Sequence, residues 1–224
     1  MPDTNFVNYN DFYPKNIPMC EETLHPKELK LISKLNKIVN GPVEGNYCFK
    51  HQTILNEKSI PVKERSWKRQ YLREAITDRE HALEIGFNAG HSAAIMLLAN
   101  PKLYLTSIDI CMYPYTVKCA KFMFKYFYPR FSFIGGSSQQ VLKKTTLAQE
   151  IDFIHVDGGH GIADFYFDID WSTKTLKPGG KLMIDDAYLP DYQKYIAYKL
   201  QQQEYKIANT IRPTSHENIL LERL

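Results

Sequence analysis

Apolar and polar positions alternate along most of the chain with two different periods. Short apolar runs rich in β-branched and aromatic residues predict buried strands, and longer segments with apolar residues three and four positions apart predict amphipathic helices. The expected elements, in order, are strand 82–85, helix 92–99, strand 103–108, helix 115–126, strand 131–134, helix 138–148, strand 151–156, helix 162–176, strand 181–184, helix 191–204 and strands 205–211 and 217–224. Because strands and helices take turns, we expect an α/β fold: a Rossmann-like, seven-stranded, mostly parallel sheet with helices on both faces.

The last two predicted strands are joined by a short polar turn, Arg-Pro-Thr-Ser-His at 212–216. A connection of this length cannot cross over a sheet, so it predicts an antiparallel pair. The sheet is therefore expected to end in a C-terminal antiparallel hairpin at one edge.

Residues 1–65 differ in character from the rest of the chain. They are rich in Asn, Lys, Tyr and Pro, and their one strong helix prediction, 27–39, ends at Asn40-Gly41-Pro42. A further helix is expected over 62–77. We therefore divide the chain into an N-terminal extension, 1–65, and a main domain, 66–224. The extension is expected to be a lid, a substrate contact or a subunit contact of a homo-oligomer, with simple packing on the core as an equal alternative.

Composition indicates an ordinary globular protein. The 224 residues are 44% hydrophobic and 24% charged, and 28 Lys and Arg against 25 Asp and Glu give a net charge of +3. This charge is too small to indicate nucleic-acid binding. A local basic cluster, made of Lys63, Arg65, Lys68, Arg69 and Arg73, is interpreted as a solvated helix face.

The cysteines and the chain start indicate a cytoplasmic protein. Cys20, Cys48, Cys111 and Cys119 form no CxxC pair and do not cluster with histidines, so we expect free thiols and no zinc site. No apolar run is long enough to span a bilayer, and the polar start does not resemble a signal peptide, so no membrane partner is expected.

The first predicted strand runs through a glycine loop directly into an apolar helix, in the segment His81-Ala-Leu-Glu-Ile-Gly-Phe-Asn-Ala-Gly-His91. A helix N-terminus at such a loop presents free backbone N–H groups and a positive dipole end to a ligand. Gly86 and Gly90 would allow close approach of that ligand. The alternative is a turn that only connects the two elements.

Polar residues also follow the next two strands. Asp109 ends the second strand about twenty residues beyond the glycine loop, the position from which a carboxylate accepts hydrogen bonds from ribose hydroxyls. It could instead cap the next helix. Gly136, Ser137 and Ser138 follow the third strand, where small residues leave room for a flat base or simply form a turn and a helix cap.

Three carboxylates, Asp157, Asp185 and Asp186, follow the fourth and fifth strands. Like charges at adjacent strand ends repel one another unless a cation lies among them, and oxygen ligands suit Mg²⁺. The alternative is that these acids cap helices or pair with lysines. His160 lies three residues beyond Asp157 and is a candidate general base or a structural hydrogen-bonding residue.

These residues resemble a known superfamily. Leu83-Glu-Ile-Gly-Phe-Asn-Ala-Gly90, Asp109, Ile154-His-Val-Asp157 and Leu176-Lys-Pro-Gly-Gly-Lys181 are similar to the motifs of class I S-adenosylmethionine-dependent methyltransferases. Asp157-Gly-Gly-His160 with Asp185-Asp186 resembles the metal-dependent O-methyltransferases, in particular the macrolide-sugar type and the cephalosporin hydroxylase-related group. The chain has Asn88 where many members have glycine, and His160 where catechol-type enzymes have lysine.

The resemblance implies a role for each motif residue. The residues expected to bind S-adenosylmethionine are Glu84, Gly86, Phe87, Asn88, Gly90, Ser92, Asp109, Ile110, Gly136, Ser137, Ser138 and Asp157. Asp157, Asp185 and Asp186 would hold Mg²⁺. His160 and Asp157 are the expected catalytic residues, with His160 taking the proton from the acceptor hydroxyl.

We therefore expect an S-adenosylmethionine-dependent O-methyltransferase that acts on a hydroxyl of a small molecule or sugar with help from Mg²⁺. The aromatic residues Tyr47, Phe49, Trp67 and Tyr188 are candidates for a substrate wall, with core or surface packing as the alternative. The rival hypotheses are a methyltransferase acting on RNA or protein and a non-catalytic module that keeps the fold. A dinucleotide-binding oxidoreductase is disfavoured, because the first loop lacks the complete GxGxxG motif.

Overall fold

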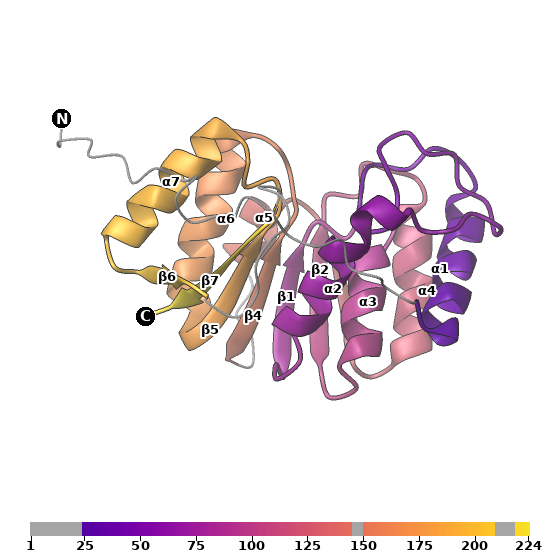
Figure 1. The fold of residues 1–224 in the computed structure, drawn as a ribbon, viewed down its shortest axis with the longest axis horizontal. Helices are drawn as coiled ribbons and strands as arrows, with labels where there is room; N and C mark the ends of the chain where they lie inside the picture. The colour runs from indigo at the N-terminus through magenta and orange to yellow at the C-terminus, as the bar shows by residue number, and fades with distance from the viewer. Residues whose placement is uncertain (1–23, 145–149, 209–217) are drawn as a thin grey trace.

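The computed structural model describes residues 24–144, 150–208 and 218–224, and these residues form a seven-stranded sheet in the order β3-β2-β1-β4-β5-β7-β6 (Figure 1). The strands are β1 (His81–Ile85), β2 (Tyr104–Asp109), β3 (Phe131–Gly135), β4 (Ile151–Val156), β5 (Leu176–Ile184), β6 (Tyr205–Ile207) and β7 (Ile219–Arg223). The five strands β1 to β5 pair in parallel, and β7 pairs antiparallel with both β5 and β6. The predicted Rossmann-like sheet is confirmed.

The strand order reverses between β1 and β4, which are adjacent in the sheet although two strands separate them in sequence. In open α/β sheets the crevice for a ligand lies beyond the carboxyl ends of the strands at such a reversal. A ligand site is therefore expected at the ends of β1, β2, β4 and β5.

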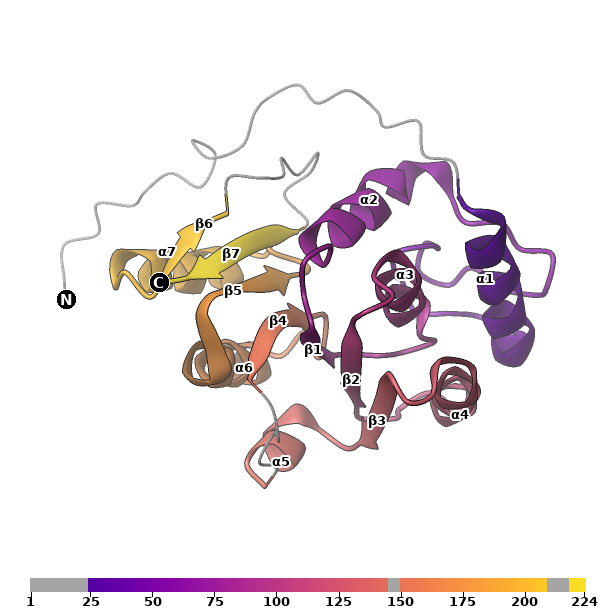
Figure 2. The same ribbon diagram turned by 90° about the horizontal axis from the view of Figure 1, so that it is seen from below.

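Helices cover both faces of the sheet, as expected (Figure 2). One layer consists of α1 (Pro26–Val39), α2 (Ser66–Ala75), α3 (His91–Ala99) and α4 (Thr116–Phe127), with the 3-10 turn η2 (Lys63–Arg65) before α2. The other layer consists of α5 (Ser138–Leu142), α6 (Ile162–Thr175) and α7 (Pro190–Gln201). Alternate residues of each strand point to the two layers, so that on β1 Ala82 joins one apolar core and Leu83 the other.

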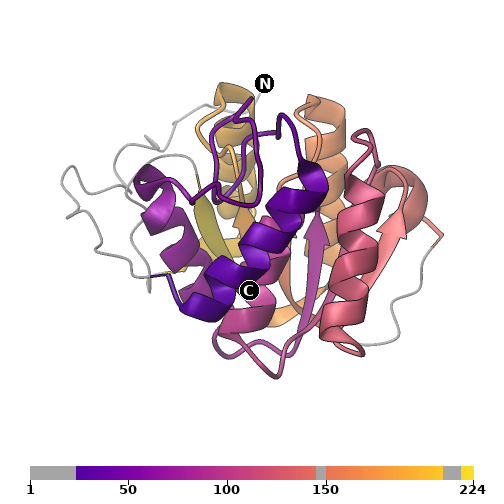
Figure 3. The ribbon, with the colours of Figure 1, turned by 90° about the vertical axis from the view of Figure 1, so that its right-hand side faces the viewer.

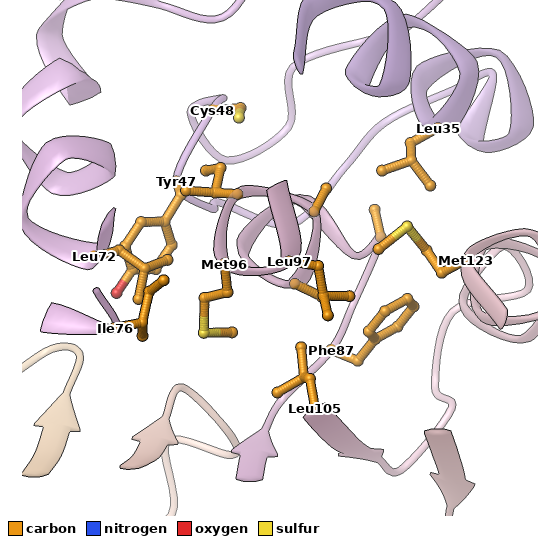
Figure 4. Close-up of a cluster of buried hydrophobic side chains, with 14 of the residues drawn as sticks. Leu35, Tyr47, Cys48, Leu72, Ile76, Phe87, Met96, Leu97, Leu105 and Met123 are labelled. Carbon is orange, nitrogen blue, oxygen red and sulfur yellow. The ribbon is translucent and has the colours of Figure 1, made fainter. Parts of the chain in front are cut away.

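The described part of the N-terminal segment is built into the first layer. Helix α1 packs against α3 and α4, and it ends at Asn40, whose left-handed φ of 43° closes the last turn. Figure 3 shows α1 crossing that side of the molecule beside α4. In Figure 4, Leu35 of α1 and Tyr47 lie in one cluster with Leu72, Phe87 and other buried side chains of the sheet and its helices.

Some boundaries differ from the sequence expectations. Strand β5 begins at Leu176, five residues before the predicted start, because Leu176 pairs with Ile151 and the irregular Lys-Pro-Gly-Gly segment is taken up by a register shift before Phe153. Helix α5 ends at Leu142. The predicted turn at 212–216 lies outside the described residues, although its two flanking strands pair as expected.

The interpretation of the basic cluster as a solvated helix face is wrong for two members. Lys68 is 3% exposed and pairs with Asp185 after β5, and Arg69 is 2% exposed. The Arg69 guanidinium donates to the carbonyl oxygens of Tyr47 and Val62, and Arg73 forms an ion pair of 2.7 Å with Glu28 of α1. Most of this cluster therefore holds elements together.

The predicted free thiols are confirmed for Cys48, Cys111 and Cys119. Cys20 lies outside the described residues. Across the described ranges, no helix combines the length and the apolar character needed to cross a membrane.

Candidate active site

The loop between β1 and α3 is shaped by two glycines that pack against the protein itself. Gly86 has a φ of 97°, and a Cβ atom there would lie 1.8 Å from the carbonyl oxygen of Asp157. Gly90 has a φ of 80°, and its Cβ would lie 2.5 Å from the ring of Phe87. Close internal packing therefore requires both glycines. The side chain of Phe87 is buried in the core, so Phe87 could contact a ligand only through its backbone.

Asp109 is a carboxylate whose orientation is fixed by the backbone around it. At the end of β2 it is only partly buried. Its two carboxylate oxygens accept hydrogen bonds from the backbone N–H groups of Asn88, at 2.7 Å, and Cys111, at 2.7 Å. Asn88 has a φ of 51°, which asparagine tolerates, and its side chain accepts a hydrogen bond of 2.8 Å from Tyr115. Each carboxylate oxygen can accept a second hydrogen bond, so the pair is oriented for two neighbouring hydroxyls.

The residues expected near the flat base of the cofactor differ in what their side chains do. Ile110 is 61% exposed next to Asp109 and offers an apolar surface, and Gly136, with a φ of 144°, donates its N–H to the carbonyl oxygen of Asp109. Ser137 is the N-cap of α5. Ser138 bonds the buried carboxyl of Asp168. The helix-cap alternative is therefore realised at Ser137.

A row of buried polar side chains crosses the sheet beneath this loop. Glu84 of β1 is fully buried, and its oxygens accept hydrogen bonds from Ser92 of α3, at 2.5 Å, and Ser107 of β2, at 2.6 Å. His155 of β4 lies opposite Glu84 in the sheet register, with its Nδ1 3.6 Å from the Glu84 carboxylate. Glu84 thus ties β1, β2 and α3 together behind the predicted cofactor loop.

Tyr47 closes this row from the N-terminal segment. Its hydroxyl lies 2.9 Å from Nε2 of His155 and accepts a hydrogen bond of 2.8 Å from Asn218, next to β7. Burial, reinforced by the charges of Asp185 and Asp157, raises the pKa of this phenol well above its usual value. Tyr47 therefore stays neutral. It is fully buried, as is Phe49, so for both residues core packing replaces the substrate wall considered from sequence.

The three carboxylates predicted at the ends of β4 and β5 do meet, together with a lysine that the sequence interpretation placed on the surface. The Lys68 ammonium lies 2.7 Å and 2.8 Å from the two oxygens of Asp185. Burial raises the pKa of Asp157 well above its usual value, and the charge of Asp185 adds to this effect. The neighbouring Lys68 lowers the pKa of Asp185 against its own burial. The buried part of the site thus contains its own cation.

His160 lies at the mouth of the same site. Its Nδ1 is 3.1 Å from the carboxylate of Asp186, and 63% of its side chain is exposed. The hydrogen bond to Asp186 raises the pKa of His160 above its ordinary value, and the charge of Glu44 adds to the increase. A shallow pocket opens here, lined by Val156, Asp157, Gly158, Gly159, His160, Phe165, Asp185, Asp186 and Tyr192. The geometry suits an imidazole oriented by a carboxylate to receive a proton.

The predicted magnesium ligands do not fit a metal ion as they stand. Among the residues in the described ranges, no three His, Cys, Asp or Glu side chains are placed to hold one. Both oxygens of Asp185 already bind Lys68, and Asp186 binds His160. Two of the three expected ligands therefore have protein partners: Asp185 follows the alternative of pairing with a lysine, whereas Asp186 pairs with a histidine.

Sequence reasoning missed the contribution of the loop that follows α1. The Glu44 carboxylate accepts a hydrogen bond from Tyr113 and lies 3.1 Å from His51, and its backbone N–H points to the hydroxyl of Tyr115, which in turn bonds Asn88. These contacts place Glu44 over the predicted cofactor loop on the His160 side. No motif signals this position. Of the other aromatic candidates, Tyr188 is 49% exposed and Trp67 is partly buried.

Comparisons with known proteins agree with this fold. Residues 83–187 match the family model described as a methyltransferase domain. Solved structures that share the fold include an O-methyltransferase from Bacillus cereus in complex with SAH (S-adenosylhomocysteine), with a TM-score of 0.59 and 13% identity, where the match covers 90% of this chain and 92% of that chain. An O-methyltransferase from Streptomyces achromogenes involved in tomaymycin synthesis, in complex with SAM (S-adenosylmethionine), has a TM-score of 0.57 and 13% identity, with coverage of 90% and 91% of the two chains. An SAH-bound methyltransferase from Podospora anserina has a TM-score of 0.58 and 17% identity, with coverage of 75% and 81%. None of the curated proteins compared matches the chain.

Proposed function

We propose that this protein transfers a methyl group to a hydroxyl of a small molecule or sugar. The proposal starts from the match of residues 83–187 to a methyltransferase domain and from the class I S-adenosylmethionine-dependent methyltransferase fold. The observation that carries the proposal is the His160–Asp186 pair of 3.1 Å at the mouth of the pocket beyond β4 and β5. A hydroxyl acceptor must lose its proton to become a good nucleophile, and this pair is built to take one.

The cofactor side of the proposal rests on Asp109 and the first turn of α3. The carboxylate of Asp109 is held by two backbone N–H groups and would bind the two ribose hydroxyls. The N-terminus of α3, from His91, has no side-chain cap and would present its backbone N–H groups to the methionine carboxylate. When bound, S-adenosylmethionine supplies a methyl group on a sulfonium centre, which is already an excellent leaving group.

The acceptor side rests on His160. Because Nδ1 bonds Asp186, Nε2 is the nitrogen that remains to accept the hydroxyl proton. Asp186 stabilises the imidazolium that forms, as an orienting carboxylate does in other catalytic pairs. Asp186 has a backbone φ of 54°, and its N–H donates a hydrogen bond of 2.9 Å to the carboxylate of Asp185, which helps to fix its position. No step of this proposal uses Mg²⁺, which would have to compete with Lys68 for Asp185.

The rival acceptors receive less support. A methyltransferase acting on RNA needs a continuous basic surface, and within the described chain the strongest basic cluster is largely used internally: Lys68 and Arg69 are buried, and Arg73 pairs with Glu28. The other rival hypothesis, a non-catalytic module that keeps the fold, is tested by the following experiment.

The experiment is an isothermal titration of the full chain with S-adenosylhomocysteine, followed by a screen of sugar and small-molecule hydroxyl acceptors with detection of the methylated product. We expect micromolar binding to the wild type, at least about a tenfold loss of affinity in Asp109→Ala, and unchanged affinity in Asp191→Ala, an exposed acid at the start of α7. Thermal unfolding of each variant checks that the fold is retained.

A second pair of variants tests the base. His160→Ala should retain binding of S-adenosylhomocysteine and lose turnover by about a hundredfold or more. His81→Ala is the matched control, because His81 lies at the opposite end of β1 against Tyr104. Turnover in His160→Ala at the wild-type rate would remove the base, and absence of any cofactor binding would favour the non-catalytic module.

A further inference from the structure

Lys68 is a buried lysine at the centre of the acidic site. It comes from α2, outside the segment 83–187, and only 4% of its side chain is exposed. Its ammonium contacts both oxygens of Asp185 and lies 5.2 Å from the centre of the Tyr47 ring. A lysine is seldom buried unless its charge is paired, so this position is specifically stabilised.

Two of the three acids at this site already have protein partners. Asp185 pairs with Lys68, and Asp186 pairs with His160. Clustered carboxylates need a cation to offset their repulsion, and here the protein provides it from a helix of its own.

We propose that Lys68 is the permanent cation of this site, occupying at Asp185 the position that a divalent metal would otherwise take. This inference rests on the proposed methyl transfer and specifies its class: the transfer proceeds without a bound metal. A metal that activates an acceptor does so by holding two neighbouring oxygens, as in a catechol or a vicinal diol. An ammonium imposes no such chelation, so the acceptor class widens to compounds with a single hydroxyl. Lys68 acts as a positioning residue, because it holds Asp185, whose carboxylate accepts the N–H of Asp186.

The test measures metal binding directly and needs no cofactor or acceptor. Mn²⁺ is titrated into the full chain, and free Mn²⁺ is followed by electron paramagnetic resonance. The wild type should bind no Mn²⁺ at micromolar concentration. Lys68→Ala should gain one Mn²⁺ with affinity at least about tenfold higher than the wild type, because affinity for hard cations rises with the number of available carboxylates. Adding Asp185→Asn to Lys68→Ala should abolish the gain.

Two further variants keep the result interpretable. Lys194→Ala removes an exposed lysine that also pairs with an aspartate, Asp191, and should bind no Mn²⁺. Lys68→Arg keeps a cation beside Asp185 and should also bind none, and it serves as the folded comparison if Lys68→Ala does not fold.

The decisive result against the proposal is stoichiometric micromolar Mn²⁺ binding by the wild type that Asp185→Asn removes. A folded Lys68→Ala that gains no Mn²⁺ would also overturn it. These outcomes are independent of the titration with S-adenosylhomocysteine, so a protein that binds the cofactor and Mn²⁺ would retain the proposed function and lose only this inference.

Discussion

His91, the first residue of α3, gives a quantitative prediction about pH and stability. Its ring is 1% exposed and lies 5.3 Å from the ring of Phe49. Nε2 is 2.9 Å from the side-chain oxygen of Asn36, whose amide nitrogen donates to the carbonyl of Ser59, so Nε2 carries the hydrogen. Nδ1 has no partner among the described residues. Burial lowers the pKa of His91 from 6.5 to about 3.

The sign follows from where the proton binds. Below its ordinary pKa the unfolded chain takes up a proton at His91 and the folded chain does not, so the stability falls as the pH decreases from 6.5 toward 3. Each pH unit costs about 1.4 kcal/mol. Between about pH 7.5 and about pH 5, His91 alone should therefore reduce the free energy of unfolding by about 2 kcal/mol.

The assay compares urea unfolding of the wild type and His91→Gln at these two pH values. The glutamine amide can still donate to Asn36, and it does not titrate. Other groups contribute to the pH dependence, for example Asp168, whose pKa burial raises to about 7, but they cancel when the two proteins are compared. The wild type should lose about 2 kcal/mol more than the variant over this range. An equal loss in both would refute the assignment of a neutral, buried His91.

Three further predictions concern the site. Asp186→Asn removes the negative charge that helps to raise the pKa of His160, so the rate of methyl transfer, which needs neutral His160, should rise with pH at a lower midpoint than in the wild type. An unmoved midpoint in the pH–rate profile contradicts this. Gly86→Ala should destabilise the fold by about 3 kcal/mol or more in urea, because its Cβ would overlap the Asp157 carbonyl at a φ of 97°. Tyr47→Phe should cost about 2 kcal/mol or more, because two buried groups lose their partner.

Matched substitutions control the two stability measurements. Gly41→Ala places a Cβ in ordinary contact, 3.7 Å from the nearest atom, and should change the stability little. Tyr198→Phe alters a half-exposed tyrosine of α7. If either control costs as much as its partner variant, the packing or hydrogen-bond explanation fails.

The fold was largely predictable because most of its strands and helices are marked by sequence patterns within the element itself. Each strand from β1 to β4 is a short apolar run bounded by polar or glycine-rich turns, and the observed ends agree with the predicted ones within about one residue. The start of β5 could not be found this way, because Pro178 and two glycines interrupt the apolar pattern and only pairing with Ile151 extends the strand.

The site was predictable in part, for the same reason. The acids and His160 follow strand ends, so sequence order alone places them at one edge. Lys68 was missed because its partner Asp185 is 117 positions away. One signal was present: Lys68 shares a helix face with Leu72 and Ala75, at spacings of four and seven residues, and all three are buried. A lysine beside apolar positions more often extends to solvent, so the pattern alone does not reveal its burial.

The hydroxyl of Tyr47 has a consequence for recombining this protein with others that share its fold. It joins a residue ahead of the matched segment to His155, 108 positions later, and to Asn218, 171 positions later. Exchanging residues 24–61 for the equivalent stretch of another protein would therefore replace the residue that links β4 to Asn218, just before β7. A chimera would keep these contacts only if the donor stretch, β4 and the segment leading into β7 came from the same protein.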